Sequence, residues 1–165
     1  MYKPVEGTED TRPVTMVLVT DQFHCHRLII AGRQLADERD TALEVVNVAD
    51  PSRTRNPEAM EFLFQASREY DAAMAIHYSA RPERFLGELI QKRRPTAVVT
   101  GLPGEGSDLL RKLWLRFDKV DFYLVERDGS LRPVDVLDKA EAGRDGPRDI
   151  LPYIGIGLAP LQASE

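Results

Sequence analysis

The sequence predicts an α/β protein in which a parallel β-sheet lies between two layers of helices. Short apolar runs rich in β-branched residues begin near residues 14, 43, 73, 97 and 121. Segments with helical apolar periodicity separate these runs, so each repeat is one βα unit. Because crossovers between parallel strands are right-handed, five such strands favour a three-layer doubly wound sandwich.

The first strand is expected over residues 14–19, a nearly unbroken apolar run. Such a run is typical of a strand buried on both faces, which places it in the middle of the sheet. A polar turn over residues 20–22 follows, and then a helix from about His24 to Glu38. The apolar stripe of this helix comprises Leu28, Ala31, Gly32, Leu35 and Ala36.

The second and third units repeat this order. A strand is expected over residues 43–48, and Asn56-Pro57 is a typical helix start, an N-cap followed by proline. The inner face of that helix is predicted to hold Met60, Leu63, Phe64 and Ser67. The remaining predicted elements are a strand over 72–76, a helix from Ser79 or Ala80 to the Arg93-Arg94-Pro95 stop, a strand over 96–100, a helix over 108–117 and a strand over 121–126.

The chain divides by composition into three parts. Residues 1–13 are polar and are expected to form a flexible arm, and residues 14–127 form the α/β domain. Residues 128–165 are a C-terminal extension rich in proline and glycine, with a short edge strand expected over 134–137. The apolar run 153–156 needs cover, either on the domain or in a dimer interface.

Composition excludes several classes of protein. The chain has 165 residues, of which 42% are hydrophobic, enough for the core of one globular domain. Its net charge of −5 opposes binding to nucleic acid or to an anionic membrane surface. No apolar run approaches the length of a membrane span, and the first residues lack the pattern of a secretory signal. We therefore expect a cytoplasmic protein without membrane or nucleic-acid partners.

The candidate ligand site follows from the predicted topology. Ligands of open parallel sheets bind at the carboxyl ends of the strands, where the strand order reverses. Thr20 and Asp21 follow the first strand, and Val48 ends the second. Asp21 suits a ribose hydroxyl or an adenine amine as an acceptor, although a turn or cap role is equally compatible with its position.

A glycine-rich turn follows the fourth strand. Gly101, Gly104 and Gly106 allow backbone amides to approach a phosphate, and Ser107 is expected to cap the next helix. The alternative is a plain strand-to-helix turn, and the carboxylate of Glu105 opposes a bound phosphate.

The run His24-Cys25-His26 resembles a metal cluster only at first sight. Adjacent helical residues point about 100° apart, so three in a row do not converge on one ion. No third group is evident to activate Cys25 as a nucleophile. We expect no metal site here and no catalytic role for Cys25.

Several of these segments resemble the universal stress protein family. The first strand and its Thr20-Asp21 end, the strand over 42–48, and the run 96–104 with its Gly-x-x-Gly are similar to that family's pattern. Residues 23–29, FHCHRLI, are closer to the stress-protein-like domain of potassium-sensing histidine kinases. The resemblance implies a sheet in the order 3-2-1-4-5, a homodimer, and binding of ATP, ADP or AMP. In the family's motif G-x2-G-x9-G-S/T, Gly101 and Gly104 match the first pair, whereas Trp114 and Leu115 stand at the second.

Two functions remain open at this point. The first is a regulatory protein that binds an adenine nucleotide weakly through Thr20, Asp21, Val48, Gly101, Gly104, Gly106 and Ser107. The second is a dimeric scaffold in stress signalling that recognises a protein partner and no nucleotide. An enzyme is the third and least favoured class, with negligible ATP hydrolysis.

Overall fold

The structure, a computed structural model, describes residues 11–53, 55–104, 108–135 and 137–139. The chain forms two compact units. The first holds the described residues up to Gly101 together with Lys119–Pro133, and the second holds those of Leu102–Asp118 and of the chain from Val134 onward.

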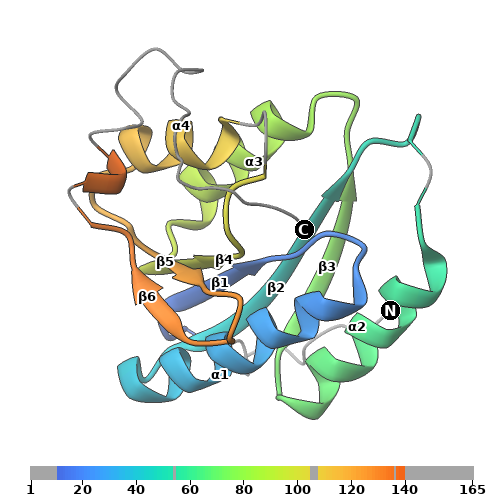
Figure 1. Cartoon of the computed structure of the whole chain (residues 1–165), viewed down its shortest axis with the longest axis horizontal. Helices are drawn as coiled ribbons and strands as arrows, with labels where there is room; N and C mark the ends of the chain where they lie inside the picture. Colours follow the sequence, from blue (N-terminus) through green and yellow to red (C-terminus); the bar gives the residue numbers. More distant parts are fainter. Residues whose placement is uncertain (1–10, 54, 105–107, 136, 140–165) are drawn as a thin grey trace. The chain divides into compact units, whose positions relative to one another are not determined.

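One sheet organises the first unit. In the described part of the chain, six strands follow the order β3-β2-β1-β4-β5-β6 (Figure 1). Strands β1 to β5 pair in parallel, and β6 is antiparallel to β5. The predicted order 3-2-1-4-5 is confirmed, with one short strand added. The strands are β1 (Val14–Leu18), β2 (Ala42–Ala49), β3 (Ala73–Tyr78), β4 (Ala97–Thr100), β5 (Asp121–Val125) and β6 (Leu131–Pro133).

Strand β1 is central, as its apolar run predicts. Val17 lies opposite Val45 on β2 and Val99 on β4, and all three side chains are fully buried. The buried hydroxyl of Thr15 is satisfied by the hydroxyl of Thr41 at 2.7 Å. Hydrocarbon contacts on both faces therefore hold this strand, with its buried polar group paired.

Helices cover both faces of the sheet. Helices α1 (His26–Arg39) and α2 (Pro57–Glu69) lie on one face, and α3 (Pro82–Arg93) lies on the other (Figure 1). A 3-10 turn, η1 (Phe23–Cys25), precedes α1 where a continuous helix from His24 was expected. Helix α3 starts after Arg81, with Pro82 in its first turn. None of the helices in the described residues is long and apolar enough to cross a bilayer.

Helix α1 approaches β1 closely at Gly32. A Cβ atom at this position would lie 2.4 Å from Cγ2 of Val17 and 3.1 Å from Cδ1 of Leu43. Both distances are below ordinary van der Waals contact, so the helix sits at its present depth only because residue 32 has no side chain.

The second unit contains helix α4 (Leu109–Arg116), in which Leu113 and Trp114 are buried. Its N-cap is Asp108, not Ser107 as predicted; Asp108 also forms an ion pair with Lys112 at 3.5 Å. Later in this unit Asp135 and Asp138 accept hydrogen bonds from each other's backbone N–H groups, at 2.8 and 2.9 Å.

Two other sequence predictions are wrong. The edge strand is Leu131–Pro133 instead of residues 134–137, because a tight turn at Gly129, with φ of +89°, brings the chain straight back onto β5. Phe64 is 37% exposed, although the helical pattern places it inward. Residues 140–165, with the apolar run 153–156, lie outside the described residues.

Candidate functional site

The carboxyl end of β1 is fixed by hydrogen bonds in both directions between Val19 and β2. The N–H of Val19 donates to the carbonyl of Val46 at 2.9 Å. The buried amide of Asn47 donates through Nδ2 to the carbonyl of Val19 at 2.8 Å. The point at which the chain leaves the sheet is therefore set by a buried side-chain bond as well as by the strand ladder.

Asp21 follows directly and connects two loops. Its Oδ2 accepts a hydrogen bond from the backbone N–H of Asn56 at 2.7 Å. Asn56 in turn caps α2, since its Oδ1 accepts from the N–H of Ala59 at 3.1 Å. Asp21 thus joins the exit of β1 to the start of α2, and its half-exposed carboxylate remains at the surface of the unit.

A second carboxylate, Asp50, stands just beyond β2. Its Oδ1 accepts from both the backbone N–H and the hydroxyl of Ser52, at 2.9 and 2.8 Å. These two hydrogen bonds, with a smaller effect from Arg53, lower the pKa of Asp50 below 3.8. Asp50 is therefore ionised at neutral pH.

Val48 and Thr20 also lie at the carboxyl ends of β2 and β1. The carbonyl of Val46 faces β1, so alternation along β2 turns the main-chain groups of Val48 to the same side. The Thr20 hydroxyl lies 3.4 Å from the sulfur of buried Cys25. Thr20 itself is exposed.

Two glycines mark the exit of β4, and neither is required by packing. A Cβ atom at Gly101 would have a single neighbour within 4 Å, Cδ2 of Leu28 at 4.0 Å. A Cβ atom at Gly104, in the second unit, would have none, and neither glycine has a positive φ. Gly106 and Ser107 lie outside the described residues.

The residues Thr20, Asp21, Val48 and Gly101 thus all lie in the first unit at the carboxyl ends of β1, β2 and β4, because these three strands are adjacent in the sheet. Sequence reasoning missed Asn47 as a site-forming residue. An isolated asparagine inside the apolar run LEVVNVA is a signal for it, since a buried amide needs a partner.

Asp50 was also missed as a candidate. The spacing Asp-x-Ser, typical of a turn in which the acid accepts from the residue two positions later, is its signal in the sequence.

His26 and His77 make separate contacts. The Nδ1 of His26 is 3.1 Å from the carbonyl of Phe23, and His77 packs on the ring of Phe85 with centroids 5.1 Å apart. Among the described residues, no three His, Cys, Asp or Glu side chains form a group suited to a metal ion.

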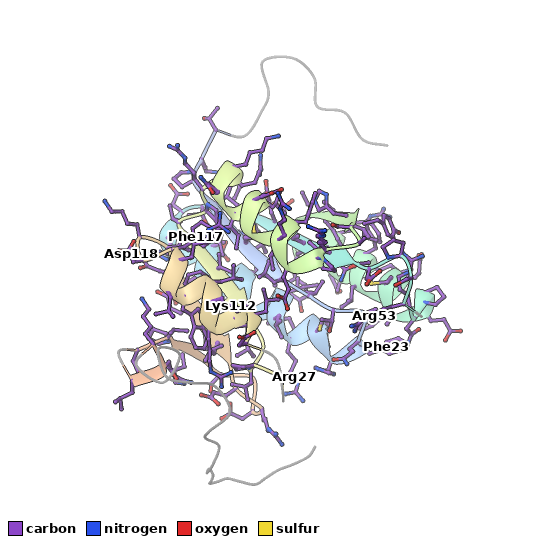
Figure 2. All side chains as sticks on the ribbon, turned by 90° about the horizontal axis from the view of Figure 1, so that it is seen from above. Phe23, Arg27, Arg53, Lys112, Phe117 and Asp118 are labelled. Carbon is purple, nitrogen blue, oxygen red and sulfur yellow. The ribbon has the colours of Figure 1, made fainter. Side chains whose placement is uncertain are left out.

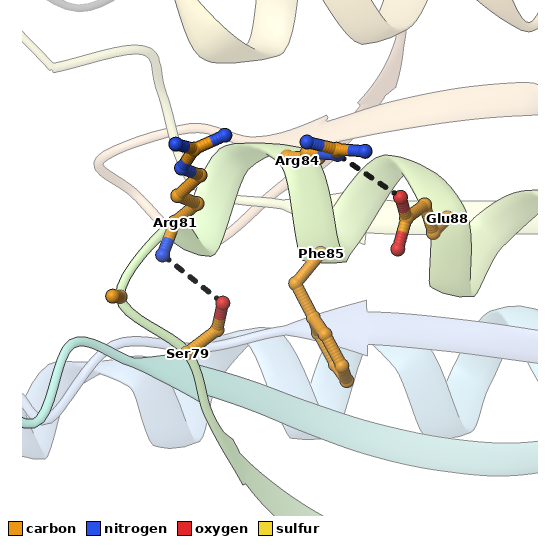
Figure 3. A pocket seen from close by; sticks show the side chains of 6 residues that line it. Ser79, Arg81, Arg84, Phe85 and Glu88 are labelled. Atoms are coloured by element: carbon orange, nitrogen blue, oxygen red, sulfur yellow. Dashed lines mark hydrogen bonds and ion pairs between the residues drawn. The ribbon is translucent and has the colours of Figure 1, made fainter.

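Two other surface features lie outside the predicted site. A shallow hollow at the start of α3 is lined by Ser79, Ala80, Arg81, Arg84, Phe85 and Glu88 (Figure 3). Within it Arg84 is already paired with Glu88 at 3.2 Å. Phe23, the first residue of η1, is exposed (labelled in Figure 2) and packs against Phe62 with ring centroids 5.5 Å apart. Neither feature involves a predicted site residue.

Comparison with known proteins shows which solved structures have a similar fold. No family model and no curated protein matches the sequence. A universal stress protein solved in complex with cAMP aligns with 71% of this chain and 98% of its own, at 16% identity and a TM-score of 0.53. A universal stress protein from Archaeoglobus fulgidus aligns with 69% and 92%, at 16% identity and a TM-score of 0.51. The chain therefore has the fold of the universal stress proteins.

Proposed function

We propose that this protein is a regulator of the universal stress protein type that binds an adenine nucleotide at the carboxyl ends of β1, β2 and β4. The proposal rests on the position of Asp21, Val48 and Gly101. All three lie at the carboxyl ends of adjacent strands, at the point where the strand order reverses between β1 and β4. One solved protein of the same fold holds cAMP. The run 23–29 supports a closer likeness to the stress-protein-like domain of sensor kinases.

The two carboxylates that follow β1 and β2 suit the nucleoside part of the ligand. Carboxylates accept hydrogen bonds and repel phosphate, so Asp21 and ionised Asp50 favour the ribose hydroxyls and the adenine amine. The main chain of Val48, facing the end of β1, supplies groups to the base.

The exit of β4 suits the phosphate. Neither packing nor backbone conformation explains glycine at 101 or 104, and glycine is the residue that lets a ligand approach main-chain N–H groups. Gly106 and Ser107 extend this proposed loop. In the sequence Glu105 lies within the same run, and its carboxylate opposes a high phosphate charge.

We expect weak binding of ATP for this reason and because Trp114 and Leu115 replace the second glycine pair. Each charge-assisted hydrogen bond is worth roughly 1.5–3 kcal/mol, or one to two decades of affinity. Loss of two such bonds moves a micromolar site toward millimolar. AMP and cAMP, which carry less charge, should bind at least as well as ATP.

Titration calorimetry of the full chain tests the proposal. We expect dissociation constants between about 10 µM and 1 mM for AMP, cAMP or ATP. Gly101→Val should weaken binding at least tenfold, because its branched side chain occupies the approach to the backbone. Asp21→Asn keeps an oxygen for the N–H of Asn56 and should weaken adenosine binding as well.

Ala80→Val is the matched control. Ala80 is exposed and also follows the carboxyl end of a strand, but that strand is β3, which lies outside the proposed site. The control should bind as the wild type does. No heat with any adenine nucleotide at millimolar concentration would overturn the proposal, as would affinity unchanged by Gly101→Val.

A further inference from the structure

One arginine side chain joins the segments that follow β1 and β5. Arg27 is the second residue of α1, and its side chain is exposed (labelled in Figure 2). Its Nη1 donates a hydrogen bond to the backbone carbonyl of Arg127, the second residue after β5. The start of α1 is therefore tied to the turn between β5 and β6, at the carboxyl ends of the parallel strands.

The exit of β4 lies between these two segments. In the sheet β4 separates β1 from β5, and neighbouring strands are about 4.8 Å apart. The start of α1 also lies against this exit, because a Cβ atom at Gly101 would meet Cδ2 of Leu28, the residue after Arg27, at 4.0 Å. A side chain that reaches from α1 to Arg127 therefore passes the exit of β4, where we propose that a phosphate approaches the main chain.

The guanidinium of Arg27 retains most of its donors for a ligand. It carries five N–H groups in a planar fork and has no acceptor. One of these groups donates to the carbonyl of Arg127, and the described residues give the side chain no other hydrogen bond and no ion pair. Two neighbouring donors of the fork can thus bind two oxygens of one phosphate group.

The acid nearest to Arg27 along this turn is already paired. Oδ1 of Asp128 accepts hydrogen bonds from the hydroxyl and the backbone N–H of Ser130, at 2.7 and 2.9 Å. These two bonds are the main causes that lower the pKa of Asp128, and the positive charge of Arg27 is a smaller one. Asp128 therefore leaves the guanidinium available while keeping it close to the turn.

Charges at the carboxyl ends of the strands differ from one side of the site to the other. The carboxylates of Asp21 and Asp50 follow β1 and β2, whereas Arg27 extends toward β5. A nucleotide has the same asymmetry, with an uncharged nucleoside and an anionic phosphate. Complementarity of charge thus favours one orientation, with the nucleoside at β1 and β2 and the phosphate beside β4.

We propose that Arg27 binds the phosphate of the nucleotide and makes the site specific for adenosine monophosphates, linear or cyclic, over adenosine. The inference rests on the proposed function and adds to it a side chain from α1, outside the glycine-rich turn. A guanidinium fork matches the geometry of a phosphate group. One such fork suits one phosphate, and the carboxylate of Glu105 opposes further phosphate charge.

Titration calorimetry of the full chain with adenosine, AMP and cAMP tests this role. The wild type should bind both monophosphates at least tenfold more tightly than adenosine. Arg27→Met keeps the aliphatic stem and removes the donors, so its affinity for AMP and cAMP should fall about 10- to 100-fold. Its affinity for adenosine should stay unchanged. Arg27→Lys keeps the charge without the fork and should lose less affinity than Arg27→Met.

Arg81→Met is the matched control. It removes the same charge from an exposed arginine that follows β3, outside the proposed site, and should bind AMP as the wild type does. Higher ionic strength should weaken AMP binding more in the wild type than in Arg27→Met, since the charge pair is absent from the variant. Circular dichroism verifies that each variant is folded.

The outcomes separate this inference from the proposed function. Equal affinity of the wild type for AMP and adenosine, or AMP affinity unchanged by Arg27→Met, would overturn the role of Arg27 and leave nucleoside binding in place. An equal loss of adenosine and AMP affinity in Arg27→Met would show that Arg27 only supports the fold, and would also overturn the role. No binding of any of the three ligands would overturn both proposals.

Discussion

Replacing Gly32 by alanine sets helix propensity against packing. Alanine is better than glycine inside a helix by about 1 kcal/mol. However, the new methyl group would lie 2.4 Å from Cγ2 of Val17, which is fully buried between Val45 and Val99 and has no room to turn away. Overpacking of this kind costs about 1–3 kcal/mol. We expect the clash to prevail, with a net loss of about 1 kcal/mol in the free energy of unfolding.

Urea denaturation measures this loss, and the melting temperature should fall by about 2–4 °C. Gly101→Ala is the control, because its methyl group would meet only one atom at 4.0 Å; its stability should stay near that of the wild type. Val17→Ala removes the opposing methyl groups, so Gly32→Ala should be tolerated better in that background by about 1 kcal/mol. A variant Gly32→Ala that is more stable than the wild type by the full helix-propensity gain, with the two substitutions additive, would refute the reasoning.

Three further predictions concern the residues around the site. Asn47→Ala leaves the buried carbonyl of Val19 without its donor and should lower the free energy of unfolding by about 1–3 kcal/mol in urea denaturation. Asn56→Ala removes the cap of α2 and should cost about 1 kcal/mol by the same measurement, whereas Asn56→Ser should retain most of the stability. The pKa of Asp50 and of Asp128 is lowered from 3.8 by hydrogen bonds from serines, so their contribution to stability is complete above about pH 5 and declines as the pH falls through the lowered pKa values. Replacing both acids by asparagine should flatten the dependence of the urea midpoint on pH below about pH 4; an unchanged acid slope would show that these bonds do not persist in solution.

The strands of the sheet are well predicted from the sequence because each one is marked by its own short apolar run. The uninterrupted apolar run around Val17 indicates a central strand, and the resemblance to stress proteins supplied the strand order. β6 escaped prediction because three residues ending in proline carry almost no strand signal, and only pairing with β5 makes them a strand. The position of an edge strand therefore depends on a turn and a partner, neither of which periodicity reveals.

The strand order was predictable, and it alone brings Asp21 to the carboxyl ends of the central strands. The contacts that Asp21 makes there were not predictable. Its bond to the N–H of Asn56 joins residues 35 positions apart and leaves no local pattern in the sequence. Gly101 differs from Asp21 in this respect. The sequence pattern alone singled it out, and in the described structure packing does not require a glycine there.

The central place of β1 also dictates an order of folding. Its contacts with β2 close over 28 positions, as between Val19 and Asn47, whereas those with β4 span 82, as between Val14 and Thr96. Closing the longer loop costs roughly 1 kcal/mol more in chain entropy, so β1 and β2 should pair first. On the ribosome one side of β1 then stays open until β4 has emerged. During that interval the apolar strand β1 is exposed to non-native partners, so rapid pairing with β4 should favour the native state over aggregation.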